Sequence, residues 1–190
     1  MVAKPNDFMR EALKCAMRAA RHDDVPIGAV IVKNGQIVAR GENKVQKRMD
    51  PTAHAEMEAI RTAARRLEQK FLDNCDMYVT LEPCAMCATA ISLARIRRLI
   101  YAADDAKGGG IEHGARIYDT DRHLFMPTVT KDSAYSDISA KLLKGFFKKL
   151  RAKNAKKPVR RQTRSTLTRL SRNVKVRAKI IRKTLKGAKN

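Results

Sequence analysis

Two short segments of the sequence contain side chains that could bind a metal and move protons. One segment contains His54 and Glu56, and the other contains Cys84 and Cys87. Two thiolates and one imidazole suit zinc better than magnesium or calcium. Three protein ligands leave one position of a tetrahedral site for water, as in catalytic rather than structural zinc sites. The residue types therefore predict a catalytic zinc centre.

Glu56 lies two residues after His54 and is placed to handle protons rather than to bind the metal. Cys84 and Cys87 are three residues apart, so within a helix they share one face. The start of a helix favours negative charge, which lowers the pKa of a thiol and prepares it to bind a metal as a thiolate. Both segments are expected at helix starts, which favours a metal site.

The remaining cysteines and histidines leave alternatives open. A C-x-x-C pair alone could also be a structural zinc site completed by Cys15 or Cys75, or a redox pair. The apolar patterns predict instead that Cys15 and Cys75 pack in the core. His22 and His123 are expected at the surface or in loops. His113 follows a glycine-rich loop and could approach the site, although a single loop histidine is usually incidental.

Hydrophobic periodicity and turn residues predict the elements that position these side chains. Strands are expected at 26–32, 36–40, 76–81 and 98–102, with Asn34-Gly35 as a hairpin turn. Helices are expected at 6–21, at 50–67 opened by Asp50-Pro51, at 83–94 opened by Pro83, and from about 135 onward. Residues 107–134 are expected to be irregular with short pieces. A hairpin followed by alternating strands and helices predicts an α/β fold with a mixed sheet.

Over about residues 5–152 the sequence resembles the bacterial-type tRNA-specific adenosine deaminases of the cytidine deaminase superfamily. The resemblance rests on Ile27–Val30, Asn43, Asp50–Glu56, Glu82–Cys87, Asp105–Lys107 and Phe146-Phe147. It implies a three-layer α/β/α sandwich around a mixed five-stranded sheet, one Zn²⁺ per subunit and a homodimer with active sites near the subunit interface. It also implies a zinc-dependent hydrolase that deaminates the wobble adenosine of a tRNA anticodon to inosine.

Within this resemblance, the H-x-E and P-C-x-x-C segments are the signature of zinc base deaminases. The resemblance implies that His54, Cys84 and Cys87 bind the metal. Glu56 would take a proton from zinc-activated water and deliver protons to the base and to the leaving ammonia.

The resemblance further implies five substrate-binding residues. Asn43 would hydrogen-bond the flipped base, and Asp105 and Lys107 would lie in the loop that lines the anticodon pocket. Phe146 and Phe147 would lie near the nucleotides that flank the target. An alternative for the two phenylalanines is a place in the hydrophobic core.

Three features depart from the family pattern. Glu42 stands before Asn43 where tryptophan is frequent, and Glu58 stands at a position that is usually apolar. Residues 108–113 also differ from the small-residue stretch of well-known members. An acid near bound RNA would repel phosphate unless it points away.

Charge divides the chain into two expected parts. Residues 1–140 contain 21 Lys and Arg and 19 acidic residues, a balance of 21 − 19 = +2, whereas residues 141–190 contain 20 Lys and Arg and no acid. We expect a deaminase domain at 1–152 and a basic extension at 153–190 that is conditionally helical or disordered. Such a segment favours a polyanion, so contact with RNA phosphates is expected. An anionic membrane surface or a solvated tail are the alternatives.

Two other functions remain open. One is deamination of a free base or nucleoside, such as guanine or cytosine, and the other is a zinc-stabilised nucleic-acid-binding protein without catalysis. The basic extension favours RNA over a small neutral base. The apolar stretches are too short for a spanning helix, and no apolar signal core is found, so a cytoplasmic protein is expected.

Overall fold

The structure, a computed structural model, describes residues 5–120 and 125–155. The chain divides into two units, residues 1–150 and 151–190. Nearly all of the basic extension predicted at 153–190, as well as His123, lies outside the described residues. In the described part, no helix combines the length and the apolarity needed to cross a membrane.

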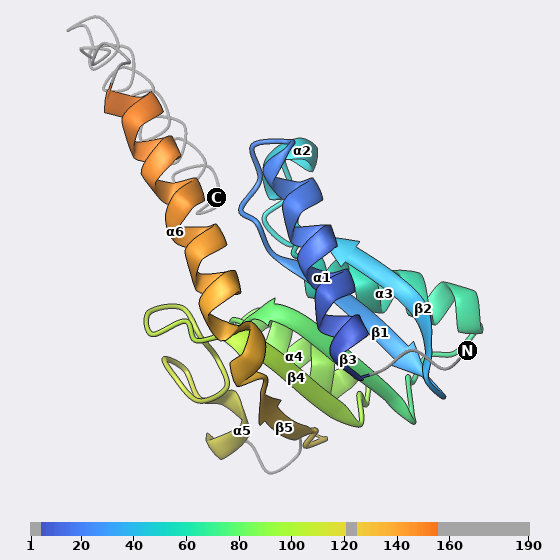
Figure 1. The fold of residues 1–190 in the computed structure, drawn as a ribbon. Helices are drawn as coiled ribbons and strands as arrows, with labels where there is room; N and C mark the ends of the chain where they lie inside the picture. Colours follow the sequence, from blue (N-terminus) through green and yellow to red (C-terminus); the bar gives the residue numbers. More distant parts are fainter. Residues whose placement is uncertain (1–4, 121–124, 156–190) are drawn as a thin grey trace, which may run out of the picture. The chain divides into compact units, whose positions relative to one another are not determined.

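A five-stranded mixed sheet forms the centre of the first unit (Figure 1). Its strands lie in the order β2 (Gln36–Glu42), β1 (Gly28–Lys33), β3 (Cys75–Leu81), β4 (Arg98–Ala103) and β5 (Thr128–Lys131). β1 is antiparallel to both β2 and β3, whereas β4 is parallel to both β3 and β5. The mixed five-stranded sheet is thus confirmed.

The first two strands form the hairpin that the turn sequence predicts. Asn34 and Gly35 connect them with φ angles of 50° and 75°. Two consecutive left-handed residues match the twist of the flanking strands, and asparagine and glycine adopt this conformation with least strain. The antiparallel pairing also contains a bulge between Ile31 and Val32.

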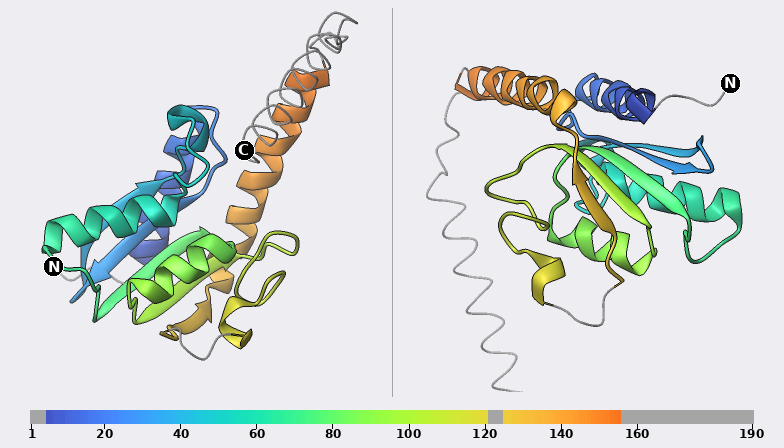
Figure 2. Two further views of the ribbon diagram at one scale, coloured as in Figure 1. Left: turned by 180° about the vertical axis from the view of Figure 1, so that it is seen from behind. Right: turned by 60° about the horizontal axis from the view of Figure 1, so that its bottom comes forward.

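Alternate residues of the strands build a core on each face of the sheet. On one face, α1 (Pro5–Ala20) packs Met9 and Cys15 against Val30. On the other face, Ile31 packs with residues of α3 (Ala55–Leu67) and α4 (Ala85–Leu93). The right-hand view of Figure 2 shows these layers, with α1 on one side of the sheet and α3 and α4 on the other. The three-layer α/β/α sandwich is confirmed.

The segment after β4 contains short elements, as predicted. They are the single-turn helix α5 (Ile117–Thr120) and the short strand β5. The last helix, α6 (Ser133–Ala155), begins two residues before the expected start. Cys15 and Cys75 are both buried, as expected, and His22 is exposed in a turn.

Two predicted helix starts are wrong. α3 begins at Ala55 rather than at Asp50, because the Asp50 carboxylate accepts hydrogen bonds from the N–H and hydroxyl of Thr52 and forms a local turn. α4 begins at Ala85 rather than at Pro83, whose carbonyl instead accepts the N–H of Gly110. The four-residue helix α2 (Val45–Arg48) was not predicted at all.

Candidate zinc and proton-transfer site

The two helix starts bring one histidine and two cysteines together. His54 is the residue that precedes α3, and Cys84 is the residue that precedes α4. Both residues have extended backbone angles. Because α3 and α4 pack on the same face of the sheet, these side chains point into one shared space. His54 and Cys84 are therefore neighbours in the fold although they are 30 residues apart in the chain.

The three candidate ligand atoms form a compact cluster. His54 Nδ1 lies 3.7 Å from Cys84 Sγ and 3.5 Å from Cys87 Sγ. All three atoms lie within 4.8 Å of one another. One imidazole nitrogen and two sulfurs at this spacing fit a single zinc ion with a position left for a further ligand. The donor set predicted from the sequence is assembled in the fold.

The electrostatics of the cluster favour a thiolate. A hydrogen bond from the Cys87 thiol, together with one from His54, lowers the pKa of Cys84 to about 4, although burial opposes the shift. The hydrogen bond to Cys84 raises the pKa of His54 above its usual value despite burial. The pKa of Cys87 is raised by its hydrogen bond to Cys84 and by burial. These shifts favour the thiolate at Cys84 and the protonated thiol at Cys87.

Glu56 is buried beside this cluster, with 3% of its surface exposed. Burial raises the pKa of its carboxyl, and the Cys87 thiol is a hydrogen-bond partner. Its Oε2 atom is buried without a hydrogen-bond partner among the described residues. A buried carboxylate oxygen without a partner is rare in folded proteins, and here it adjoins a metal-binding donor set. This oxygen is therefore available to a water molecule or a substrate held at the cluster.

Asn43 lies close to the same helix start. It is 4% exposed, and its N–H donates to the carbonyl of Ile27 at 3.1 Å. The next residue, Lys44, donates its N–H to the carbonyl of Ala53 at 2.9 Å. This bond fixes the segment that contains Asn43 against the residue that precedes His54.

Glu82 organises the other side of the cluster. Its Oε1 atom accepts the N–H groups of Ile111, Glu112 and His113 at 2.9–3.2 Å. Its Oε2 atom accepts the N–H of Asp105 at 3.1 Å and lies 2.8 Å from His113 Nδ1. Although burial opposes it, the backbone N–H groups of His113, Asp105 and Glu112 together lower the pKa of this carboxyl.

The loop after β4 is thereby held against the Cys84 segment. A Cβ atom on Gly110 would lie 2.5 Å from the Ala85 nitrogen and 2.7 Å from the Cys84 carbonyl carbon, so only glycine fits. The sequence motif contains Glu82 but indicates no function for it. His113, expected to be incidental, contacts this carboxylate. The signal for the role of Glu82 in the sequence is a carboxylate two residues before the first cysteine.

Comparisons with known proteins agree with this geometry. Residues 3–103 match the family described as the cytidine and deoxycytidylate deaminase zinc-binding region. The chain belongs to this deaminase family. It is 47% identical over 150 residues to a protein from Agrobacterium fabrum named tRNA-specific adenosine deaminase, an alignment that covers 79% of this chain and 98% of that protein.

Two solved deaminases are also similar. One, from a study of A-to-I editing by tRNA:A34 deaminases at the wobble position, is 47% identical with a TM-score of 0.70, over 73% of this chain and 99% of that chain. The other, a guanine deaminase from Bacillus subtilis, is 43% identical with a TM-score of 0.52, over 54% of this chain and 66% of that chain.

A hollow in this deaminase fold brings two of the predicted substrate-binding residues together. Asp105 and Phe147 line the same pocket of about 400 Å³ between the ends of β3 and β4 and one face of α6. Asn43, Lys107 and Phe146 are not among the described residues that line it. Lys107 is exposed in the loop after Asp105, whose carboxylate accepts the Lys107 N–H.

The two phenylalanines pack on each other rather than in the core. Their rings meet edge to face at a centroid distance of 5.5 Å, and Phe147 is 38% exposed. Phe146 is half-buried and belongs to neither core cluster. The alternative that both are core residues is therefore not supported in this chain.

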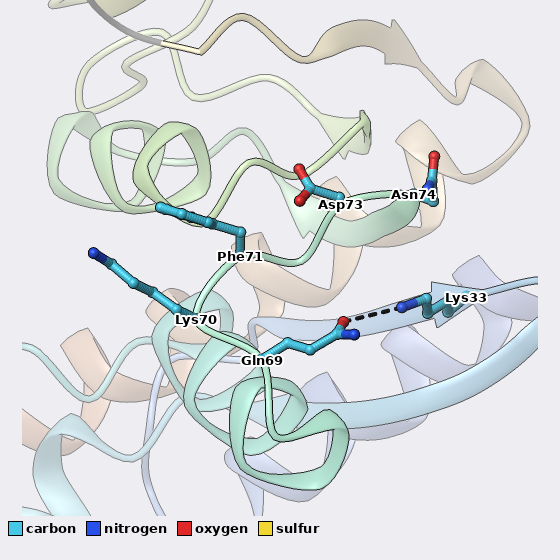
Figure 3. Close-up of a pocket in the computed structure, with 6 residues that line it drawn as sticks. All are labelled: Lys33, Gln69, Lys70, Phe71, Asp73 and Asn74. Carbon is cyan, nitrogen blue, oxygen red and sulfur yellow. Dashed lines mark hydrogen bonds between the residues drawn. The ribbon is translucent and has the colours of Figure 1, made fainter.

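A second hollow lies at the opposite end of the sheet (Figure 3). It measures about 380 Å³ and is lined by Lys33, Gln69, Lys70, Phe71, Asp73 and Asn74. The Lys33 ammonium donates to Gln69 across it at 3.0 Å. It contains no histidine or cysteine and adjoins the start of β3, whereas the zinc cluster follows the end of that strand. This hollow is therefore separate from the deaminase site.

Proposed function

We propose that this chain is a zinc-dependent hydrolase that converts the wobble adenosine of a tRNA anticodon to inosine. The observation that carries the proposal is the His54, Cys84 and Cys87 cluster beside a buried carboxylate oxygen of Glu56 that has no hydrogen-bond partner among the described residues. The relative named tRNA-specific adenosine deaminase, matched over nearly its whole length, supports the same substrate. In the reaction, water adds its oxygen to C6 of adenine, the bond from C6 to the amino nitrogen breaks, and ammonia leaves.

His54, Cys84 and Cys87 are the residues that would hold the zinc ion, and Glu56 is the residue that would move protons. When bound, zinc supplies Lewis-acid activation of water near neutral pH. Glu56 accepts a proton from the attacking water and delivers it to the purine ring. It then takes the remaining proton of the new C6 hydroxyl group and delivers it to the departing amino group. Burial raises the pKa of Glu56 above its usual value, which favours a carboxyl group that can hold a proton during the reaction.

The substrate is bound by residues on both sides of the cluster. Asn43 hydrogen-bonds the flipped base, while Asp105 and Lys107 line the path of the anticodon. Phe146 and Phe147 offer aromatic faces to the flanking nucleotides, because stacking on an aromatic ring accepts any base. The exposed fraction of Phe147 and its position beside Asp105 in one pocket support this assignment.

Deamination of free guanine or cytosine is the nearest alternative function. The match to a guanine deaminase supports a shared fold, but it covers only 54% of this chain. The charge favours RNA, because 20 Lys and Arg lie in residues 141–190. A small neutral base gains nothing from such a charge.

Two further features belong to the same proposal. The protein acts as a homodimer in the cytoplasm, with active sites near the subunit interface. The deaminase domain ends near residue 152, and the basic extension at 153–190 contacts RNA phosphates without regard to base sequence.

The experiment that tests the substrate is incubation of the zinc-loaded protein with total tRNA, followed by sequencing for inosine. The proposal expects inosine at the first anticodon position of a restricted set of tRNAs. Free guanine, cytosine and adenosine are assayed beside it for ammonia release. Turnover of a free base without any inosine in tRNA would contradict the proposal.

A further inference from the structure

Glu58, one of the two acids that depart from the family pattern, lies beneath basic side chains rather than facing solvent. Its side chain is 9% exposed. Arg48 Nη1 lies 2.6 Å and Arg61 Nη1 lies 3.5 Å from Oε1, and Lys44 Nζ lies 3.5 Å from Oε2. We name these four residues, Lys44, Arg48, Glu58 and Arg61, the Glu58 cluster.

Glu42, the other departing acid, extends the cluster by one more cation. Its Oε1 atom lies 3.9 Å from Lys44 Nζ, and its Oε2 atom accepts a hydrogen bond from Arg18 Nε at 2.8 Å. Four cations thus surround two carboxylates, which leaves a local balance of 4 − 2 = +2. Glu42 and Glu58 are therefore not exposed acids that would repel RNA, because basic side chains pair with both of them.

The Glu58 cluster is joined directly to the backbone of the zinc site. Lys44 donates its N–H to the carbonyl of Ala53, and Glu58 donates its N–H to the carbonyl of His54 at 3.0 Å. Both bonds involve the last two residues before α3. One backbone hydrogen bond therefore connects Glu58 to His54, a candidate zinc ligand.

The backbone that presents Arg48 is also fixed. Arg48 ends α2, and the buried carboxylate of Asp24 accepts the N–H groups of Gln46 and Lys47 at 2.7 and 3.2 Å. A fixed backbone and a paired guanidinium leave Arg48 little freedom of orientation. A phosphate that binds there meets a prepared donor rather than a mobile chain.

The cluster has more positive charge than its acids neutralise. The side chains of Arg48 and Arg61 are 48% and 44% exposed. The contact of Arg48 with Glu58 engages one nitrogen of a guanidinium that has five N–H donors in a planar fork. Such a fork matches two oxygens of a phosphate group.

We propose that Lys44, Arg48 and Arg61 bind backbone phosphates of the substrate RNA next to the nucleotide in the zinc site, with Glu58 as the residue that orients them. This inference rests on the proposed function, since it takes the RNA to be the substrate. The contacts fix the position of the strand and do not read its bases. They complement the aromatic and hydrogen-bonding residues proposed for the pocket itself.

A matched control lies at the other end of the sheet. The buried Asp76 carboxylate pairs with Arg97 and Arg98, whose side chains are 49% and 51% exposed. Arg98 begins β4, whereas Cys84 follows the end of the parallel strand β3. Asp76 therefore holds half-exposed arginines as Glu58 does, but far from the zinc cluster.

The test compares full-length, zinc-loaded proteins in binding and turnover of an anticodon stem-loop at several KCl concentrations. The variants are Arg48→Ala, Arg48→Lys, Arg61→Ala and the control Arg98→Ala. Zinc content and thermal unfolding are measured first, so that a variant with a damaged fold is recognised. For each protein, the logarithm of the affinity is plotted against the logarithm of the KCl concentration. The values of kcat and KM are determined from turnover over a range of RNA concentrations.

Loss of one phosphate contact makes the salt slope shallower by about 0.7–0.9. We expect this change in Arg48→Ala and Arg61→Ala, with a several-fold higher KM and an unchanged kcat. Arg48→Lys keeps the slope because it keeps the charge, and its KM lies between those of wild type and Arg48→Ala. Arg98→Ala matches wild type throughout.

Equal slopes for wild type, Arg48→Ala and Arg61→Ala, while wild type still forms inosine, would overturn this inference and leave the proposed function standing. An equal change in Arg98→Ala would also overturn it, since it would assign the effect to net charge. Absence of inosine with wild type would overturn both the proposed function and the inference that depends on it.

Discussion

Glu58 and Glu82 are both buried carboxylates beside a candidate zinc ligand, yet their partners are of different kinds. Glu82, two residues before Cys84, accepts four backbone N–H groups and contacts one histidine. Glu58, four residues after His54, contacts three basic side chains. The first carboxylate determines the path of a loop, and the second determines the orientation of surface cations.

Because Glu82 pairs with backbone N–H groups and Glu58 with basic side chains, replacing each carboxylate should have a different effect. A buried backbone N–H that loses its acceptor keeps a full desolvation penalty, because the backbone cannot turn toward water. Exposed lysine and arginine side chains that lose their acid can move into solvent, where they are well hydrated. We therefore expect Glu82 to matter for folding and geometry, and Glu58 for the charge that RNA meets.

The largest effect is expected for Glu82→Ala. It removes the acceptor of N–H groups in Asp105, Ile111, Glu112 and His113 and should lower the free energy of unfolding by about 2–4 kcal/mol. Glu58→Ala is the matched comparison and should lower it by about 1 kcal/mol or less. Denaturant unfolding of both zinc-loaded variants measures the difference. Equal losses of unfolding free energy in the two variants would show that stability does not depend on whether the partners of the carboxylate are backbone N–H groups or basic side chains.

A smaller effect is expected when the loop is displaced without removing Glu82. In Gly110→Ala the new Cβ would overlap the backbone of Cys84 and Ala85, and overpacking of this kind costs about 1–3 kcal/mol. Because the displaced backbone includes Cys84, zinc should be lost to a chelator at a lower chelator concentration than from wild type. Gly145→Ala is the control, since nothing lies within 4 Å of its Cβ position. Equal zinc retention in the two variants would show that the position of the loop does not affect zinc binding.

The smallest effect is expected from removal of the distal basic extension. A chain that ends at Lys157 lacks 12 Lys and Arg but keeps both buried carboxylates and their partners. It should keep its zinc and deaminate a saturating anticodon stem-loop at close to the full-length rate. Its affinity for whole tRNA at low salt should fall, with a shallower salt slope. Salt titrations of both proteins with one tRNA measure this, and identical slopes would direct attention to a membrane or protein partner.

Much of this arrangement could be predicted from residue types at short spacing. His54, Glu56, Cys84 and Cys87 lie in two local motifs, so their chemistry is visible before any fold is known. Asn34-Gly35 predicts a hairpin because only a few residues adopt two consecutive left-handed conformations.

The rest depends on partners that are distant in the chain. The start of α4 could not be found from Pro83, because the carbonyl of Pro83 bonds to Gly110. Glu42 looks unfavourable for RNA binding in the sequence. Its partner Arg18 is 24 residues away in α1, so the ion pair between them cannot be recognised from local spacing. The strand β5 has four residues, too few for a clear alternation of apolar and polar side chains.

The central claim is that a buried carboxylate next to a zinc donor set moves protons during deamination of tRNA. Glu56→Gln tests it most directly, because the amide keeps the size of the side chain but cannot exchange protons. We expect the variant to bind one zinc per chain and to keep its affinity for the anticodon stem-loop. Its single-turnover rate of inosine formation should fall by at least about a hundredfold. A rate close to wild type, with zinc retained, would contradict the account.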